Sequence, residues 1–369
     1  MLAAPSRSPS PLGSQTGGSQ TGGPQTGGPQ TGGTKAPAPQ VLLSLSPLGG
    51  CARTETNEVR CWGVFRPDAE GDHAPMGHVG APARAAIGVP ELLGGTQLAV
   101  GDHQACALGP GGLGCTGLLP RVRGVALAMA SAGGCIVGAE NVCWGDVVPG
   151  PAQGQSAPRP MFPGATQIAV GTHFACAVLE SQQVACLGWN DAGQLGAETS
   201  PGCSDADESI PCAGTPVPVR GIEQATMVAA GARHACARTL EGEVLCWGDN
   251  SSLQLGAPRK GLMPVKVPLK NVQSVAVGER HSCALTVAGE VFCWGGNRSG
   301  QLGKGDTVAS ERPALAGTFP KASTLAASGE TTCLRTPKAE VYCWGKAQSV
   351  AGSTDADTRH ERPSRVPGL

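Results

Sequence analysis

Pairs of cysteines recur along this chain at a nearly constant interval. Seven pairs are separated by eight to ten residues, and the first cysteines of successive pairs lie 47 residues apart on average. In five pairs the second cysteine begins a Cys-Trp-Gly triplet. A repeat of this length indicates an array of supersecondary units rather than one globular core. The seven pairs are Cys51/Cys61, Cys106/Cys115, Cys135/Cys143, Cys176/Cys186, Cys236/Cys246, Cys283/Cys293 and Cys333/Cys343.

Each unit contains four short runs rich in Val and small residues, separated by turn-forming residues. In the sixth unit these runs lie between Pro264 and Gly303. Four strands per repeat are typical of a propeller blade. Placing Cys283 opposite Cys293 in an antiparallel hairpin leaves residues 287–289 as a three-residue loop, with Gly where a left-handed conformation is needed. The same arithmetic holds for the other pairs, except that the second pair needs a four-residue loop.

The hairpin positions of the cysteines predict disulfides. Residues directly opposed on antiparallel strands lie within the span that a disulfide tolerates. All sixteen cysteines then have a partner, the eighth pair being Cys203 and Cys212 in a long loop after the fourth hairpin. An even count at this spacing is typical of an oxidising compartment, whereas a zinc site would need CxxC pairs, which the chain lacks. Free buried thiols in a cytosolic protein are the alternative.

The fifth and sixth units resemble the RCC1 repeat, the unit of the regulator of chromosome condensation and its relatives. The fourth unit departs from this pattern, because Leu187 stands in the Trp position and Trp189 follows two positions late. The resemblance covers roughly residues 40–369 and implies a seven-bladed β-propeller, here of a secreted, disulfide-rich, bacterial type. The residues that carry it are Gly278, His281, Trp294, Asn297, Gly300, Gln301, Leu302 and Gly303 in the sixth unit, and Gly231, His234, Trp247, Asn250, Gln254, Leu255 and Gly256 in the fifth.

We therefore predict an all-β, seven-bladed propeller over residues 41–369. Residues 361–369 look like the first strand of a further unit, and only one strand, residues 41–45, precedes the first hairpin. We expect the C-terminal strand to complete the first blade and so to close the ring. Whether the second and third blades, joined only by residues 116–127, have four strands each stays open.

Residues 1–40 have a different composition. They contain four copies of Gln-Thr-Gly-Gly among Pro and Ser, with few apolar residues, and such a segment cannot bury enough surface to offset the entropy of ordering. We predict a disordered tether. No secretory signal or lipidation motif is visible, so we expect the true start to lie upstream of Met1; a cytosolic protein is the alternative.

Charge and hydropathy exclude several function classes. The 27 Lys and Arg residues balance 28 Asp and Glu residues, for a net charge of −1, and they form no basic block. We therefore expect no electrostatic binding of nucleic acid or anionic membranes. Aromatic residues make up 3% of the chain, too few for stacking platforms that bind single strands. No run of eighteen apolar residues occurs, so we expect no membrane insertion.

The sequence contains no recognisable catalytic arrangement. Several His residues, including His234 and His281, recur at one repeat position, which favours a structural role; we expect each to hydrogen-bond a turn near the inner end of its blade. No Gly-x-Ser-x-Gly elbow and no phosphate-binding loop is present. The repeated Trp residues are expected to pack in the core rather than serve as a chromophore. We predict no enzyme activity, no cofactor and no metal site.

One acidic loop stands outside the repeat and is the best candidate for a contact surface. Asp205, Asp207 and Glu208 lie between Cys203 and Cys212; a Ca²⁺ site or a merely solvated loop are the alternatives. We predict a monomeric, extracytoplasmic binding module that presents its face loops to a protein or a surface ligand. The resemblance implies two other functions: guanine-nucleotide exchange on a small GTPase, and secreted inhibition of a β-lactamase.

Overall fold

The fold is described from a computed structural model. The chain divides into two units, Met1–Pro37 and Ala38–Leu369, and all the residues described here belong to the second. The predicted tether, residues 1–40, lies outside the described residues. The described residues are 43–47, 49–56, 58–63, 87–88, 97–101, 105–109, 112–115, 126–130, 133–138, 140–145, 159–201, 209–258, 262–346 and 359–369.

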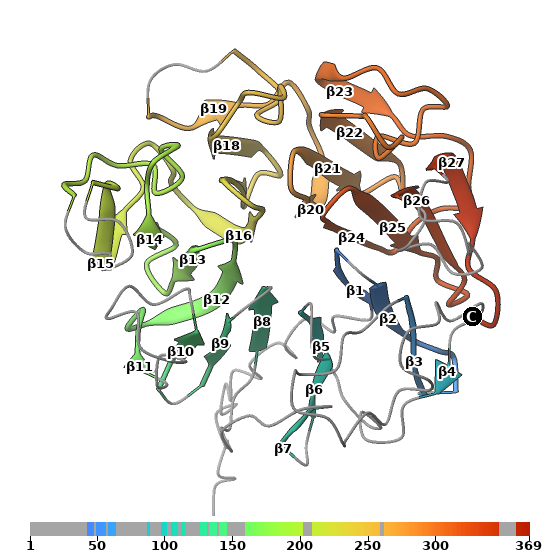
Figure 1. The fold of residues 1–369 in the computed structure, drawn as a ribbon, viewed down its shortest axis with the longest axis horizontal. Helices are drawn as coiled ribbons and strands as arrows, with labels where there is room; N and C mark the ends of the chain where they lie inside the picture. The colour runs from blue at the N-terminus through green and yellow to red at the C-terminus, as the bar shows by residue number, and fades with distance from the viewer. Residues whose placement is uncertain are drawn as a thin grey trace, which may run out of the picture. The chain divides into compact units, whose positions relative to one another are not determined.

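Antiparallel strands form six sheets of four strands and one of three (Figure 1). We number the sheets 1 to 7 in chain order. Sheets 1 to 3 consist of β1 (Leu43–Ser46), β2 (Gly49–Arg53), β3 (Val59–Gly63) and β4 (Ile87–Gly88); β5 (Gln97–Val100), β6 (Ala105–Gly109) and β7 (Gly112–Cys115); and β8 (Ala126–Ala130), β9 (Gly133–Val137), β10 (Val142–Gly145) and β11 (Arg159–Pro160).

Sheets 4 to 7 have the same up-and-down order, with the innermost strand first. They consist of β12 (Ala165–Val170), β13 (Phe174–Leu179), β14 (Val184–Trp189) and β15 (Cys212–Pro218); β16 (Ala225–Ala230), β17 (His234–Thr239), β18 (Val244–Gly248) and β19 (Val265–Lys266); β20 (Val272–Val277), β21 (His281–Thr286), β22 (Val291–Gly295) and β23 (Ser310–Leu315); and β24 (Thr324–Ser328), β25 (Thr331–Arg335), β26 (Val341–Lys346) and β27 (Arg359–Arg365).

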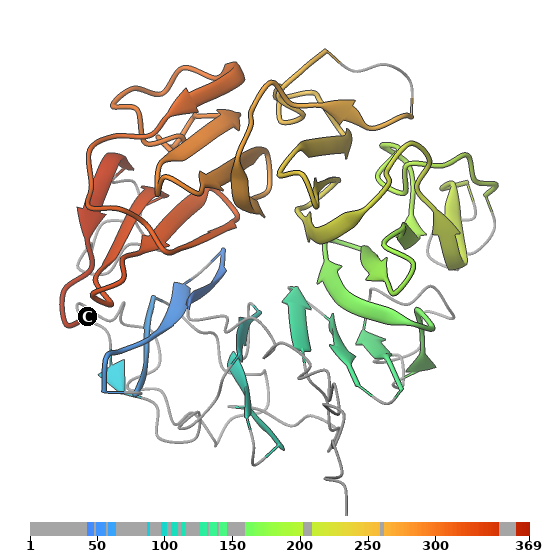
Figure 2. The same ribbon diagram turned by 180° about the vertical axis from the view of Figure 1, so that it is seen from behind.

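The sheets surround a central axis, as in a β-propeller (Figures 1 and 2). Each innermost strand contacts the innermost strand of the next sheet, and β24 contacts β1. We predicted seven blades and left open whether the second and third have four strands each; the described residues form six four-stranded blades, because sheet 3 has four strands and sheet 2 has three.

The C-terminal strand does not complete the first blade as predicted. β27 pairs with β26, and β4 occupies the outer place in sheet 1, with Ile87 opposite Cys61. The prediction placed the boundary between repeats at the wrong strand. The short run that precedes an innermost strand is the outermost strand of the previous sheet; for example, Val265 of β19 lies opposite Cys246 of β18. Side chains therefore close the ring, with β1 packed against β24.

The hairpin register agrees with the sequence prediction. Within the described residues, six cysteine pairs lie directly opposite each other and are disulfide-bonded, as Cys283 is to Cys293. The other five bonded pairs are Cys51–Cys61, Cys135–Cys143, Cys176–Cys186, Cys236–Cys246 and Cys333–Cys343. Cys106 and Cys212 each take part in a further disulfide. Cys106 lies opposite Cys115 in the strand register.

The core lies between neighbouring sheets. Trp247 of sheet 5 shares one cluster with Phe174 of sheet 4 and with Val219, which follows β15. The indoles of Cys-Trp-Gly fill these spaces, which confirms their predicted packing role. Trp62, Trp247, Trp294 and Trp344 are fully buried, and Trp144 is nearly so.

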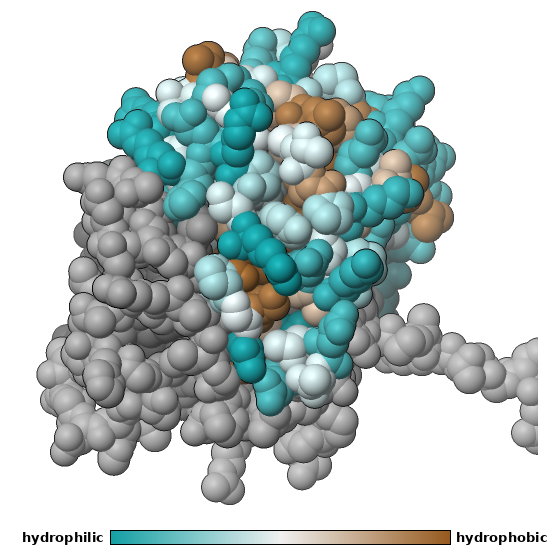
Figure 3. Space-filling view, turned by 90° about the vertical axis from the view of Figure 1, so that its right-hand side faces the viewer, coloured by the Kyte–Doolittle hydropathy of each residue, from teal (hydrophilic) through white to brown (hydrophobic). Residues whose placement is uncertain are grey.

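Some outermost strands of the ring resist further pairing. Prolines such as Pro313 of β23 and Pro363 of β27 lie in the outermost strands, and because proline has no N–H, they weaken the exposed edge as a template for another strand. On the side that carries the outer strands of sheets 6 and 7, hydrophobic residues form only small separate patches in the coloured surface (Figure 3).

Candidate interaction face

One face of the ring is built from two kinds of segment that meet in sheets 4 to 7. These are the turn between the first and second strands and the segment that follows the third strand; we call them together the loop face. One backbone hydrogen bond joins the two segments in every one of these sheets. The four bonds are Trp189 N to His173 O (2.9 Å), Asp249 N to Arg233 O (2.9 Å), Gly296 N to Arg280 O (2.8 Å) and Lys346 N to Glu330 O (3.0 Å).

Contacts between sheets hold the loop face together. The guanidinium of Arg233 in sheet 5 pairs with the carboxylate of Asp191 in sheet 4. The hydroxyl of Ser299, between β22 and β23 of sheet 6, donates to the Glu330 carboxylate of sheet 7 at 3.1 Å. Glu279 N also donates to Gly329 O at 2.8 Å. Loops fixed in this way lose little conformational entropy when they bind a partner.

Sheet 4 departs from the repeat on this face. Leu187 takes the buried place that Trp fills elsewhere and is fully buried itself. Trp189, two residues later, stays partly exposed and stacks on His173, with ring centroids 4.2 Å apart and planes 21° from parallel. The backbone of His173 is in the left-handed region, with φ of 60°. The displaced Trp is thus an amphipathic side chain presented at the surface rather than a lost core residue.

The acidic loop begins and ends beside this stack. Its ends are paired through a bridge between Pro201 and Pro211 and a hydrogen bond from Cys212 N to Ser200 O at 3.1 Å. Cys212 also lies opposite Trp189 in the strand register. The predicted contact residues Asp205, Asp207 and Glu208, together with Cys203, lie outside the described residues.

The Asn-x-x-x-Gln-Leu-Gly segments form turns. In sheet 5, Asn250 Oδ1 accepts from Leu255 N at 2.9 Å, and Gln254 Oε1 accepts from Ser252 N at 2.8 Å. Burial raises the pKa of the Asp249 carboxyl, but hydrogen bonds from Ser251 and Gln254 outweigh it and hold that pKa below its usual range. These side chains are occupied in shaping the loop face.

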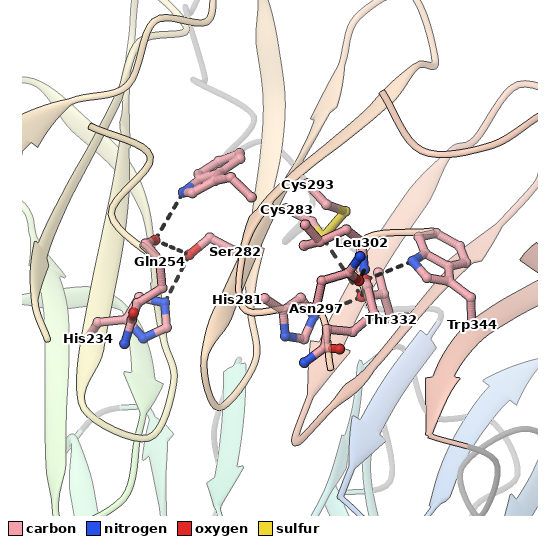
Figure 4. Close-up of a disulfide and its surroundings, with 12 residues drawn as sticks. His234, Gln254, His281, Ser282, Cys283, Cys293, Asn297, Leu302, Thr332 and Trp344 are labelled. Atoms are coloured by element: carbon pink, nitrogen blue, oxygen red, sulfur yellow. Dashed lines mark hydrogen bonds between the residues drawn. A yellow bond between two sulfur atoms is a disulfide. The ribbon is translucent and has the colours of Figure 1, made fainter. Parts of the chain in front are cut away.

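A buried polar network joins sheet 5 to sheet 6 (Figure 4). His234 Nε2 lies 2.9 Å from Ser282 Oγ, and the Ser282 hydroxyl donates to Gln254 O at 2.9 Å. The indole Nε1–H of Trp294 donates to the same carbonyl at 2.9 Å. One backbone oxygen of sheet 5 therefore receives two donors from sheet 6.

The same network recurs between sheets 6 and 7 (Figure 4). His281 Nε2 lies 2.8 Å from Thr332 Oγ1, and Thr332 and Trp344 both donate to Gln301 O, at 2.9 and 2.8 Å. The backbone oxygens of His234 and His281 do accept from turn residues of their own sheets, Gly231 N and Gly278 N, at 2.9 Å each, but the sequence did not predict where their side chains bond. Their partner lies on the next sheet, at a sequence distance that a single repeat does not reveal.

The contact between Ser282 and His234 looks like part of a catalytic triad but cannot act as one. Both residues are fully buried, so neither can touch a substrate. Burial lowers the pKa of His234 to about 4, and the nearby Asp249 carboxylate offsets only part of this. The Asp249 oxygens bond Ser251 and Gln254 instead. The recurrence with His281 and Thr332 also indicates a structural unit.

A cavity of about 230 Å³ lies along the axis, lined by residues of all seven innermost strands. Its lining is Ala, Val, Leu, Ile and Met, apart from Ser44, whose hydroxyl accepts from Val100 N at 3.1 Å. Among the described residues, no titratable side chain lines it.

In the described part of the chain, no group of three or more His, Cys, Asp or Glu residues is placed to hold a metal ion. No helix within the same residues has the length and apolar character needed to cross a membrane.

Comparison with known families identifies the repeat. Sequence models of the regulator of chromosome condensation (RCC1) repeat match residues 226–254 and 272–301, and again residues 241–285 and 288–334. These segments span sheets 5 and 6 and the start of sheet 7. No curated protein matches the chain by sequence.

Solved structures with a similar fold include three from eukaryotes. Yeast RCC1 (Prp20) bound to Kap60 is 18% identical with a TM-score of 0.59, covering 89% of this chain and 74% of that chain. Prp20p from Saccharomyces cerevisiae, described with its binding to Gsp1p and histones, is 19% identical with a TM-score of 0.58, covering 89% and 76%. The CRINKLY WD40 ectodomain of the Arabidopsis thaliana receptor kinase ACR4 is 18% identical with a TM-score of 0.50, covering 89% and 97%. At these identities the likeness concerns the fold.

Proposed function

Because the chain carries RCC1 repeats in a β-propeller, we propose that it is a non-enzymatic binding module that works outside the cytoplasm. It presents the loop face to a protein or a surface ligand, and the contact centres on Trp189 and His173. We further propose that sheet 2 acts as the seventh blade of the ring, although three of its strands are described.

The observation that carries the proposed binding face is the displaced Trp189. Every tryptophan of the Cys-Trp-Gly triplets is buried, yet Trp189 stacks on His173 at the surface, beside the paired ends of the acidic loop. Exposed Trp side chains on rigid loops are over-represented among residues that dominate binding energy. Two similar structures, both of yeast Prp20, are described with protein partners, which is consistent with this role.

The proposed compartment rests on the cysteines. Six disulfides lie within the described sheets, and their sulfur-bearing residues are at most 1% exposed. Such bonds form and persist in oxidising compartments. One similar fold is the ectodomain of a receptor kinase. Non-reducing peptide mapping of protein purified from its natural source tests this point, and free thiols at these positions in folded protein would contradict it.

The binding proposal is tested with a display library of secreted and cell-surface proteins. A partner selected on the wild-type protein should bind Trp189→Ala at least about 30-fold more weakly, the loss typical of a hot spot. Leu240→Ala is the matched control, because Leu240 is 61% exposed but follows β17 at the opposite end of the strands. Equal binding by both variants would refute the loop face, and stimulated nucleotide release from a small GTPase would favour the exchange alternative instead.

A further inference from the structure

Three successive junctions use one pair of positions in two different ways. The first position is Phe174 in sheet 4, His234 in sheet 5 and His281 in sheet 6; each begins a second strand and lies opposite a glycine. The second position lies in the following sheet and is Ala235, Ser282 or Thr332. At the first junction Phe174 and Ala235 therefore belong to one apolar cluster, and at the next two an imidazole is hydrogen-bonded to a hydroxyl.

The hydrogen bonds fix the protonation state of both imidazoles. The Ser282 hydroxyl donates its only hydrogen to Gln254 O, so its oxygen must accept from His234 Nε2–H. Thr332 donates to Gln301 O in the same way and accepts from His281. Nδ1 is then the unprotonated nitrogen in both rings, and neither Nδ1 atom has a partner although both side chains are fully buried.

We propose that His234 and His281 make the junctions between sheets 5, 6 and 7 acid-labile, so that this part of the ring loosens reversibly in mildly acidic solution. Protonation would add an N–H at Nδ1 that has no acceptor and a charge that has no water. Only a loosened junction can hydrate that charge. The junction between sheets 4 and 5, where Phe174 meets Ala235, has no group that titrates in this way.

The charged groups around the two rings do not remove this penalty. The Asp249 carboxylate and a backbone hydrogen bond with His281 both raise the pKa of His234, but burial outweighs them. The hydrogen bonds of the Asp249 carboxylate are made to Ser251 and Gln254. The other titratable group facing His281 is His234, whose charge would repel a second proton. Burial is the largest cause of the pKa shift in both histidines. The pKa of His234 is lowered to about 4 and that of His281 to about 3.

The direction of the pH effect follows from these shifts. An exposed imidazole titrates near 6.5, above both buried values, so below pH 6.5 the loosened state binds more protons than the closed one. For each histidine, the equilibrium constant for loosening then rises about tenfold for every pH unit of acidification. Full exposure of both at pH 5 raises the equilibrium constant for loosening by about a thousandfold relative to alkaline solution, and by about 500-fold relative to pH 7.

Hydrogen–deuterium exchange tests the proposal on the full chain. We expect amide protection in β17, β21 and β25, corrected for the intrinsic exchange rate, to fall steeply between pH 7 and pH 5 and to recover on return to pH 7. Protection in β13 should change far less, because its junction with sheet 5 is apolar. Equal protection in β21 at pH 7 and pH 5 in the wild-type protein would overturn the proposal.

A matched variant copies the apolar junction that the chain already uses. His234→Phe combined with Ser282→Ala reproduces the Phe174 and Ala235 pair, and should reduce the acid effect at the junction of sheets 5 and 6 by about 30-fold at pH 5. The junction of sheets 6 and 7 stays acid-labile in the same molecule and serves as an internal control. An unchanged acid effect in β17 of this variant would show that carboxylates elsewhere cause the loosening.

Discussion

Replacing Val366 by Ala tests how the ring is closed. Val366 follows β27 in sheet 7, is fully buried, and packs in one cluster with Leu43, Leu45 and Trp62 of sheet 1. No strand is shared between the two sheets. If side chains close the ring, then trimming Val366 weakens this junction directly.

The expected loss follows from the buried volume. The substitution removes two methyl groups, each worth about 0.8 kcal/mol of transfer free energy. The cavity left behind adds on the order of 1 kcal/mol. We expect the free energy of unfolding to fall by about 2–3 kcal/mol, measured by urea denaturation followed by tryptophan fluorescence. Hydrogen exchange should accelerate first in β1 and β24, which face each other across this junction.

The matched control is Val308→Ala. Val308 is 65% exposed in a loop of sheet 6, so its truncation should change stability by less than about 0.5 kcal/mol. Equal effects of the two substitutions would refute closure by side chains. Accelerated exchange in sheets 4 and 5, with β1 and β24 unchanged, would refute it as well.

Two further predictions concern the repeat itself. Gly256→Ala should cost more than about 2 kcal/mol, because φ is 72° there and an added Cβ would lie 2.7 Å from Trp294 Nε1; Gly214→Ala, whose Cβ would meet nothing within 4 Å, should change stability by less than about 0.5 kcal/mol in the same denaturation assay. Replacing Cys283 and Cys293 together by Ala should cost about 2–3 kcal/mol, the value for a ten-residue loop, and a stability change below the error of calorimetry would contradict the disulfide.

The cysteine spacing predicted the hairpins because a hairpin is a local structure. Opposed residues in an antiparallel pair have a constant index sum, so the separation of Cys283 and Cys293 fixes both register and loop length. Burial of the Cys-Trp-Gly indoles followed from the same repeat. The sheet to which the C-terminal strand belongs and the partners of the buried histidines depend on tertiary contacts between repeats, which the sequence pattern does not contain.

The errors arose where a residue belongs to a neighbouring repeat in space. The sequence does not say whether a run before the innermost strand pairs backward or forward, so β27 was assigned to the wrong sheet. The partner of His234 is Ser282, which lies in the next repeat. The sequence shows that Trp189 is displaced from the repeat position. Its stacking on His173 could not be predicted, because it depends on the left-handed backbone of His173, which the residue type does not indicate.

Matched changes across a junction give another meaning to the units that look degenerate. Phe174 replaces His in sheet 4, and its counterpart in sheet 5 is Ala235 rather than a hydroxyl residue, which leaves no hydrogen-bonding group of this pair unpaired. In sheet 1 the hydroxyl position is Gly50, where an added Cβ would lie 2.7 Å from Trp62. A junction buries both members of its pair, so a polar residue there needs a hydrogen-bond partner. His281 has Thr332 in the next sheet, whereas Thr331, whose counterpart is Gly50, donates to Lys346 O of its own sheet. The repeat motif therefore varies by pairs of positions in adjacent sheets, and loss of the His motif in one unit is no sign that the unit has lost its place in the ring.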